Sequence, residues 1–133
     1  MAGERDLEIL LRDMAPERRP GRYVFTSAAA IPPAARPIVT VVEDEGITMV
    51  VAQDEADRLG LAYDVVLAMI TLRVHSALDA VGLTAAVATA LADAGISANV
   101  VAGHFHDHVF VPIDDADRAV ATLEQLAASA VSS

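Results

Sequence analysis

The chain has 133 residues and a formal net charge of -10, and this acidic balance argues against a nucleic-acid partner because phosphate backbones would be repelled. It contains no cysteine, which excludes a disulfide framework and zinc–thiolate chemistry. No uninterrupted apolar run reaches the roughly 20 residues needed to span a bilayer, and the opening MAGERDLEIL lacks the apolar core of a secretory signal. We therefore expect a cytoplasmic protein with no membrane partner.

The first half of the chain predicts a leading helix followed by strands. Apolar residues recur at helical spacing at Leu7, Leu10, Leu11 and Met14. Pro16 ends whatever helix they form. Further apolar segments predict strands over residues 22–28, 38–42 and 47–52. The Pro-rich AAAIPPAARP connects the first two strands, and EDEG, with Gly46, makes a hairpin turn between the last two. A short helix follows, with Asp54 as its expected N-cap.

The second half of the chain predicts a more complete unit. Its elements are a strand over 66–74, a helix over 83–94, strands over 97–103 and 108–113, and a helix over 114–127. Gly95 stands where a helix C-terminal cap is expected. The order is β-α-β-β-α, which is the ferredoxin-like plan without its last strand. The other half of the chain could donate that strand.

An internal repeat at an offset of 60 residues relates the two halves. MVVAQDEADR at 49–58 lies over VFVPIDDADR at 109–118, so that Ala56-Asp57-Arg58 matches Ala116-Asp117-Arg118. Each copy reads strand, turn, strand, helix. This pattern is typical of a duplicated unit in which each half needs the other to cover its sheet.

The segment from VHSALDAVGLTAAV through NVVAG to HDHVFVP closely resembles the C-terminal half of small tandem ACT-domain proteins, an uncharacterised bacterial group related to the regulatory domains of aspartate kinases. GRYVF and GITMVVAQDEA extend the resemblance more loosely to the first half. It implies an α+β, ferredoxin-like fold of two ACT-like modules that share antiparallel strands and carry helices on one face. We expect a truncated module with its leading helix over 1–65 and a second module over 66–133.

The same resemblance implies a regulatory protein that binds a small molecule, usually an amino acid, and it implies no chemistry. We expect no cofactor. Because free sheet edges tend to pair between chains, we also expect a homodimer or a higher homo-oligomer. An enzyme is the competing class, but His75-Ser76 and His106-Asp107 are adjacent pairs whose side chains point apart on an extended chain. A third class is a structural or interaction module that oligomerises through free sheet edges without a ligand.

The motif HFHDHVF, residues 104–110, raises the question of a metal site, because alternate side chains of a strand point to the same side. The chain must reverse within HFHDH if the flanking strands pair. We therefore interpret His106, Asp107 and His108 as hairpin-tip residues, with Asp107 able to bond its local backbone, and expect no metal. Resembling proteins commonly carry an aromatic residue in place of His104. His106 and His108 could still contact a ligand, as could His75 at a strand end.

The stretch HSALDAVGLT, residues 75–84, is the better candidate for a ligand site, because a strand ends there and a helix begins. The N–H groups around Gly82, Leu83 and Thr84 suit a carboxylate. Asp79 could receive an ammonium, and the Ser76 hydroxyl can donate and accept. Asn99, on a neighbouring strand, could bind the ligand backbone. The alternative is that Ser76, Asp79 and Thr84 cap turns and that Asn99 bonds an edge strand.

Overall fold

The computed structural model describes residues 3–132, so the first two residues and the last one, which the expected module bounds include, lie outside the described residues. The chain forms two compact units. The smaller unit is Pro20–Leu67, and the larger unit combines the described residues up to Arg19 with those from Ala68 onward. The chain therefore enters the larger unit, leaves it and returns.

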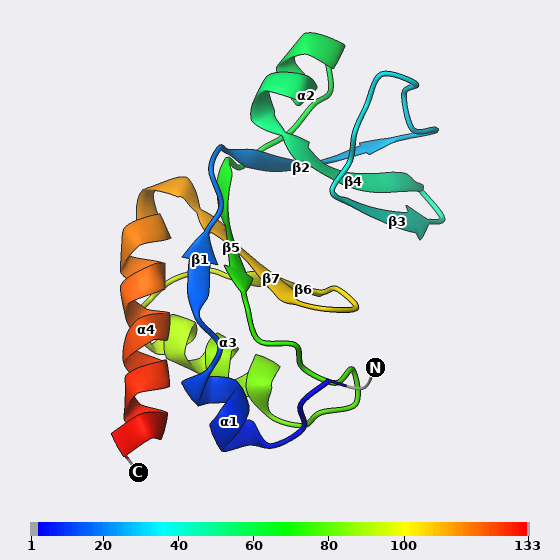
Figure 1. Ribbon diagram of the computed structural model, residues 1–133. Coiled ribbons are helices and arrows are strands. Elements are labelled where there is room, and N and C mark those ends of the chain that lie inside the picture. The colour runs from blue at the N-terminus through cyan, green and yellow to red at the C-terminus, as the bar shows by residue number, and fades with distance from the viewer. Residues whose placement is uncertain (1–2, 133) are drawn as a thin grey trace. The chain divides into compact units, whose positions relative to one another are not determined.

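The smaller unit is a three-stranded antiparallel sheet with one helix (Figure 1). Its elements are β2 (Tyr23–Ala28), β3 (Val39–Glu43), β4 (Gly46–Ala52) and α2 (Gln53–Leu59). Strand β4 lies in the middle and pairs with both neighbours. Val24, Met49, Val51 and Ala56 form its buried core. The EDEG turn requires glycine, because a Cβ on Gly46 would lie 3.0 Å from both the Ala28 oxygen and the Ser27 Oγ.

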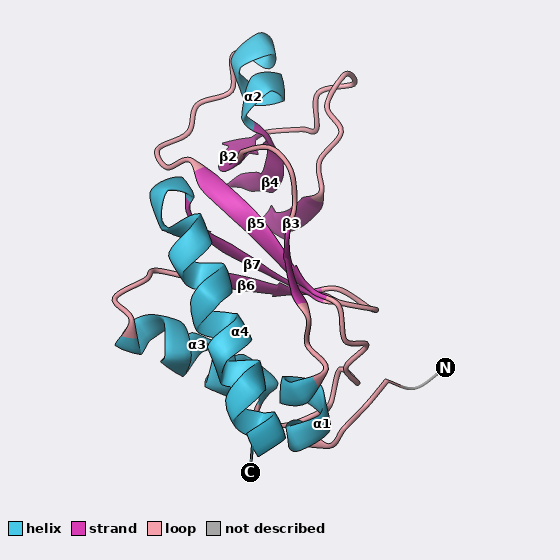
Figure 2. Ribbon diagram, turned by 60° about the vertical axis from the view of Figure 1, so that its left-hand side comes forward, coloured by secondary structure: helices cyan, strands magenta, loops and turns pink. Residues whose placement is uncertain are grey.

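The larger unit places its helices on one face of its strands (Figure 2). Its elements are α1 (Leu7–Arg12), β1 (Pro16–Arg18), β5 (Leu67–Leu72), α3 (Leu83–Asp93), β6 (Asn99–Ala102), β7 (Asp107–Pro112), the 3₁₀ turn η1 (Ile113–Asp115) and α4 (Ala116–Ser132). The strands follow the order β1-β5-β7-β6, and β6 and β7 form an antiparallel hairpin.

Strand β1 is the last strand that the second half of the chain lacks. It pairs antiparallel with β5, from Pro16 opposite Leu72 to Arg18 opposite Ile70. Leu10 and Met14, on either side of the end of α1, are fully buried in the same core as β5, β7, α3 and α4. The predicted α+β, ferredoxin-like fold with strands shared between the halves is confirmed.

Three local predictions differ from the structure. Strand β1 was not predicted, because Pro16 reads as the end of a helix and the strand has only three residues. Ala52, and not Asp54, occupies the N-cap position of α2, so the helix begins two residues earlier than predicted. Helix α4 begins at Ala116, since Ile113–Asp115 form a 3₁₀ turn before it.

The predicted hairpin tip is correct for His106 and wrong for Asp107 and His108. The reversal between β6 and β7 occupies residues 103–106, where the Gly103 N–H donates to the His106 oxygen at 2.9 Å. Asp107 and His108 belong to β7, opposite Ala102 and Val101. The repeat offset of 60 residues carries the EDEG turn at 43–46 onto 103–106, so the duplication was a better guide to the turn than the turn-forming tendency of Asp107.

The division into modules at residues 65 and 66 stays a prediction. The smaller unit is an insertion in the sequence of the larger one, because the leading helix and β1 join the core built by residues after Ala68. Within residues 3–132, no helix combines the length and the apolar character that a bilayer crossing demands.

Replacing Leu10 with Ala should strongly destabilise the larger unit, although Leu10 lies far in sequence from the residues after Ala68 that build most of its core. The side chain is fully buried, and a buried Leu→Ala change costs about 2–5 kcal/mol. Val42→Ala is the matched control, since Val42 is 84% exposed and its truncation should cost less than about 0.5 kcal/mol. Urea denaturation of both variants measures the difference. Equal losses would show that the leading helix is not part of this core.

Candidate functional site

The loop that connects β5 to α3 is held by the beginning of the chain. The Glu4 N–H donates to the His75 oxygen at 2.8 Å, and the Ala77 N–H donates to the Glu4 oxygen at 2.8 Å, so the two segments run parallel there. The Arg5 guanidinium reaches both carboxylate oxygens of Asp79, at 2.7 and 3.0 Å. These contacts fix the loop backbone beside the start of α3.

The N-terminus of α3 has no side-chain cap among the described residues. Gly82 is its N-cap residue, with φ of 108°, a left-handed conformation that favours glycine. A Cβ at this position would lie 3.0 Å from Leu7 Cδ2, so the close packing of α1 also demands glycine. The first N–H groups of α3 have no partner within the helix, as at any helix start, and present partial positive charge.

A small cavity of about 110 Å³ lies at this helix start. It is lined by Ser76, Ala77, Leu78, Ala80, Gly82, Leu83, Thr84, Ala102 and Asp107. Asp107 is only 8% exposed, and its single described side-chain hydrogen bond comes from the Ser76 hydroxyl at 3.5 Å, a long and weak contact. Burial raises the pKa of Asp107 and outweighs the Ser76 hydrogen bond and the charges of His108 and His106, which lower it.

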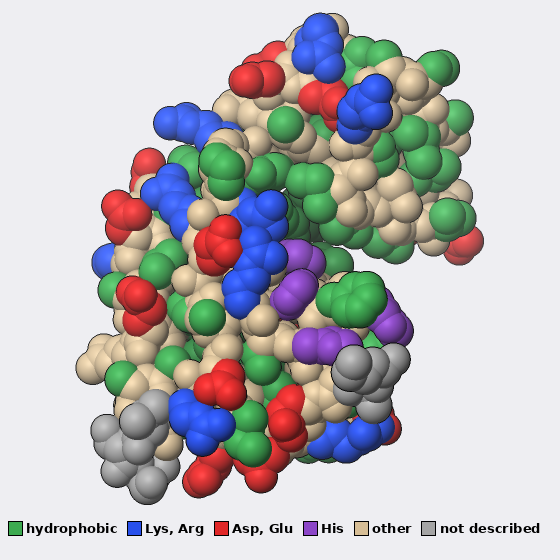
Figure 3. Space-filling model, in the orientation of Figure 1, with side chains coloured by type: hydrophobic (Ala, Val, Ile, Leu, Met, Phe, Trp, Pro, Cys, Tyr) green, Lys and Arg blue, Asp and Glu red, His purple; other side chains and the backbone are tan. Residues whose placement is uncertain are grey.

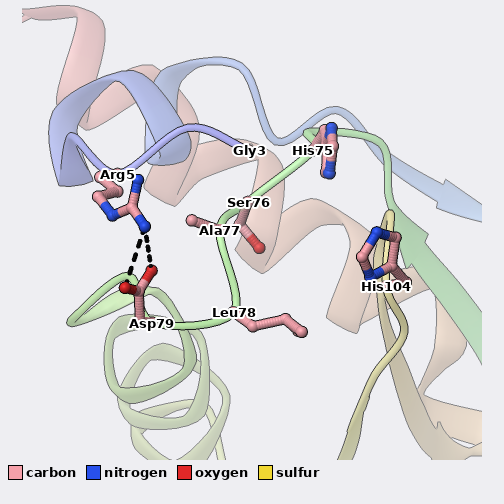
Figure 4. Close-up of a pocket in the computed structure, with 8 residues that line it drawn as sticks. All are labelled: Gly3, Arg5, His75, Ser76, Ala77, Leu78, Asp79 and His104. Atoms are coloured by element: carbon pink, nitrogen blue, oxygen red, sulfur yellow. Dashed lines mark hydrogen bonds and ion pairs between the residues drawn. The ribbon is translucent and has the colours of Figure 1, made fainter. Parts of the chain in front are cut away.

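A larger cavity of about 260 Å³ shares Ser76, Ala77 and Leu78 with the small one. Figure 4 shows its lining, with the paired Arg5 and Asp79 on one side and the imidazoles of His75 and His104 on the other. The Arg5 hydrogen bond lowers the pKa of Asp79. Both side chains are mostly exposed, at 58% and 71%, so the ion pair stands at the rim and adds little stability.

Phe105 joins the two imidazoles of the larger cavity into an aromatic group. Its ring centroid lies 5.3 Å from that of His75 and 4.8 Å from that of His104, the latter edge to face. The two imidazole centroids are 6.3 Å apart. The histidine side chains gather on one face of the larger unit (Figure 3). Within the described residues, no three side chains of His, Cys, Asp or Glu lie close enough together to hold a metal ion.

His108 and Asn99 lie on the other face of the sheet from the helix start. His108 contacts the fully buried Thr71 through Nδ1, 3.0 Å from Oγ1. Burial lowers the pKa of His108, and the charges of His106 and Arg19 lower it further. Asn99 pairs with Phe110, whereas the alternate residue Val100 packs against the core beneath the helices. Strand alternation therefore directs Asn99 away from the cavities.

The structure gathers five of the six predicted ligand-binding residues. Those that line the two cavities are Ser76, Asp79, Gly82, Leu83 and Thr84. Of the further contacts, His75 lines the larger cavity and His106 stands at the hairpin turn. Sequence reasoning missed Arg5 and Asp107. The strand pattern could have identified Asp107, because residues 107, 109 and 111 point to the same face of β7 and Val109 and Val111 are buried.

Comparison with known families identifies the fold. The ACT domain model matches residues 2–68, and a second ACT domain model matches residues 65–125. Two tandem matches agree with the ferredoxin-like arrangement of strands and helices. The chain belongs to the ACT-domain family, and this membership supports a regulatory role of the ACT type.

Solved structures agree with this assignment. A Vibrio cholerae protein of unknown function, described as a possible transport protein, is 45% identical, with a TM-score of 0.82 over 91% of this chain and 95% of its own. An Agrobacterium tumefaciens protein is 20% identical, with a TM-score of 0.72 over 84% and 87%. The ligand-free regulatory subunit of aspartate kinase from Thermus thermophilus is 10% identical, with a TM-score of 0.65 over 86% and 97%, and shares the fold. No curated protein matches.

Replacing Asp107 with Asn should stabilise the unliganded protein near neutral pH. Because burial raises the pKa of Asp107, the folded state favours the protonated carboxyl group. The stability contributed by this protonated form is present in acid, below the pKa of 3.8 of a free Asp, and is lost as the pH rises through the raised pKa of the folded state. Asn keeps the shape without the charge, so the variant should gain on the order of 1 kcal/mol at pH 7. Urea denaturation between pH 4 and 7 should show a gap that widens with pH. A variant less stable than the parent at pH 7 would contradict this account.

Proposed function

We propose that the chain is a non-catalytic regulatory protein that binds a free amino acid at the start of α3. The observation that carries this proposal is the small cavity, where a buried carboxylate and an uncapped helix N-terminus face the same space. An amino acid carries an ammonium and a carboxylate on one carbon. The two protein groups have the complementary charges.

The charges assign a role to each group. The N–H groups at Leu83 and Thr84 bind the ligand carboxylate, since a helix N-terminus favours negative charge. The ligand ammonium pairs with Asp107, and such a pair is strong because the carboxylate is largely removed from water. Ser76 Oγ accepts a further hydrogen bond. A cavity of about 110 Å³ suits this head group and leaves the ligand side chain to the adjoining space.

Asp79 takes a different role from the one expected for it. Both of its carboxylate oxygens bind Arg5, so its charge is already matched. We assign the ammonium to Asp107 and assign to Asp79 the positioning of Arg5 and of the chain start that holds the loop. Asn99 stays outside the site, because it lies on the other face of the sheet.

The groups gathered at this loop favour binding over catalysis. Ser76 is the hydroxyl at the centre of the site, and its described side-chain partner is the carboxylate of Asp107 at 3.5 Å. A nucleophilic serine requires an imidazole or an equivalent base within about 2.6–3.2 Å. His75 is the neighbour of Ser76 in sequence, yet its ring packs against Phe105 and His104.

A panel of the twenty amino acids should reveal the ligand as a rise in the thermal unfolding temperature. A ligand at about 100 times its dissociation constant adds ~2.7 kcal/mol of stability. Asp107→Asn should remove this rise, because it removes the charge that pairs with the ammonium. Asp114→Asn is the matched control, since Asp114 is exposed in η1, and it should leave the rise unchanged.

Two results would count against amino-acid binding at this site. No stabilisation by any of the twenty would reject the ligand class. An undiminished rise in the Asp107→Asn variant would place the ligand elsewhere.

A homo-oligomerising module is the second candidate function, and the outer edge of the smaller unit favours it. Among the described strands, β3 pairs with β4 alone, so its other edge is open. Val41 and Val42 on this strand are 48% and 84% exposed. Exposed apolar edge strands tend to pair between chains, which here means a homodimer or a higher homo-oligomer.

Replacing Val42 with Lys should dissociate an oligomer that forms through this edge, because a charge on an edge strand opposes pairing. Sedimentation velocity without ligand should show the parent chain as a dimer or larger and the variant as a monomer. Val65→Lys serves as the control, since Val65 is 52% exposed outside β3. A monomeric parent chain at the highest concentration measured would reject this candidate.

A further inference from the structure

We infer that the amino acid recognised by this chain has an acidic side chain, and that His75 and His104 select it. This inference rests on the proposed function, in which the small cavity holds the ligand head group. The ligand side chain then enters the larger cavity, which shares Ser76, Ala77 and Leu78 with the small one (Figure 4). The lining of the larger cavity therefore decides which side chain is bound.

Two imidazoles without hydrogen-bond partners face this cavity. Within residues 3–132, neither His75 nor His104 makes a side-chain hydrogen bond, and both rings line the space. Their centroids are 6.3 Å apart and the rings are tilted by 50°. A hydrogen bond joins heavy atoms about 2.7–3.2 Å apart, so one carboxylate between the rings can accept from both. Each imidazole can donate through a ring N–H in its neutral or its protonated form.

The other charged groups near the cavity are already matched. Arg5 and Asp79 bind one another, and the Glu4 carboxylate turns away to accept from the Arg5 and Asp6 backbone N–H groups, each at 3.0 Å. The lining therefore offers a ligand two unmatched donors and no unmatched carboxylate. An acidic ligand side chain can accept hydrogen bonds from these donors, whereas a lysine or arginine side chain would find no unpaired carboxylate in this lining to bind.

Phe105 explains how the imidazoles keep their orientation. Its ring packs against both, which restricts their rotation. The same aromatic group could instead stack on an aromatic ligand side chain. That alternative predicts a preference for phenylalanine or tyrosine and is an outcome of the test below.

Isothermal titration of the full chain with glutamate, aspartate, glutamine, asparagine, phenylalanine and tyrosine tests the inference. The acid and its amide have nearly equal shape, so their affinity ratio isolates the charge. We expect at least one acid to bind tenfold or more tightly than its amide. His75→Gln and His104→Gln should each reduce that ratio to near one while amide binding persists. His106→Gln is the control, because His106 stands at the hairpin turn, and it should keep the ratio of the parent chain.

A second measurement uses the unaltered chain and does not depend on the folding of a variant. Proton NMR should show that the acid, and not its amide, shifts the ring resonances of two of the four histidines. Equal affinity for acid and amide, a preference for aromatic amino acids, or an acid preference that survives both histidine substitutions would overturn the inference and leave the proposed function standing. Binding of no amino acid would overturn both.

Discussion

The pairing of β1 with β5 is the constraint on which the site depends. A β-α-β-β-α unit leaves one side of its first strand unpaired, and backbone groups left without partners in a core are costly. Residues 16–18 satisfy that edge. Because the short helix α1 links the chain start to β1, Gly3 and Arg5 then lie against the loop after β5. Strand sharing thus completes the sheet and builds one wall of the larger cavity at the same time.

Asp107, which lines the small cavity, favours the proposed ligand site there over simple packing. The same strand face carries Val109 and Val111, both fully buried, and an apolar residue at position 107 would extend that core. A carboxylate there is instead desolvated, with one long hydrogen bond. Such a charge lowers stability unless a cation completes it. The nearby helix N-terminus offsets part of the cost and also supplies the second half of the proposed zwitterion site.

Much of the fold could be predicted from the residues, because apolar periodicity marks strands and helices locally. The site was predictable only where its residues are consecutive, as from Ser76 to Thr84. Asn99 was predicted on the right strand, but its pairing with Phe110 places its side chain on the face of the sheet opposite the cavities. Because successive residues of a strand point to opposite faces, an error of one residue moves a side chain from one face to the other. Arg5 could not be found, since 74 residues separate it from Asp79 and no local pattern records a long-range ion pair.

The duplication also explains why the proposed site belongs to one half of the chain. A head-group site of this kind needs a strand, a loop and the free N-terminus of a helix. In the smaller unit the Pro-rich segment after β2 leads directly to β3, and no helix lies between them in the described chain. Proline fixes φ and removes an N–H donor, so this connection cannot offer the row of N–H groups that α3 presents. The first half retains the sheet of the repeat, and only the second half retains the helix start that can bind a carboxylate.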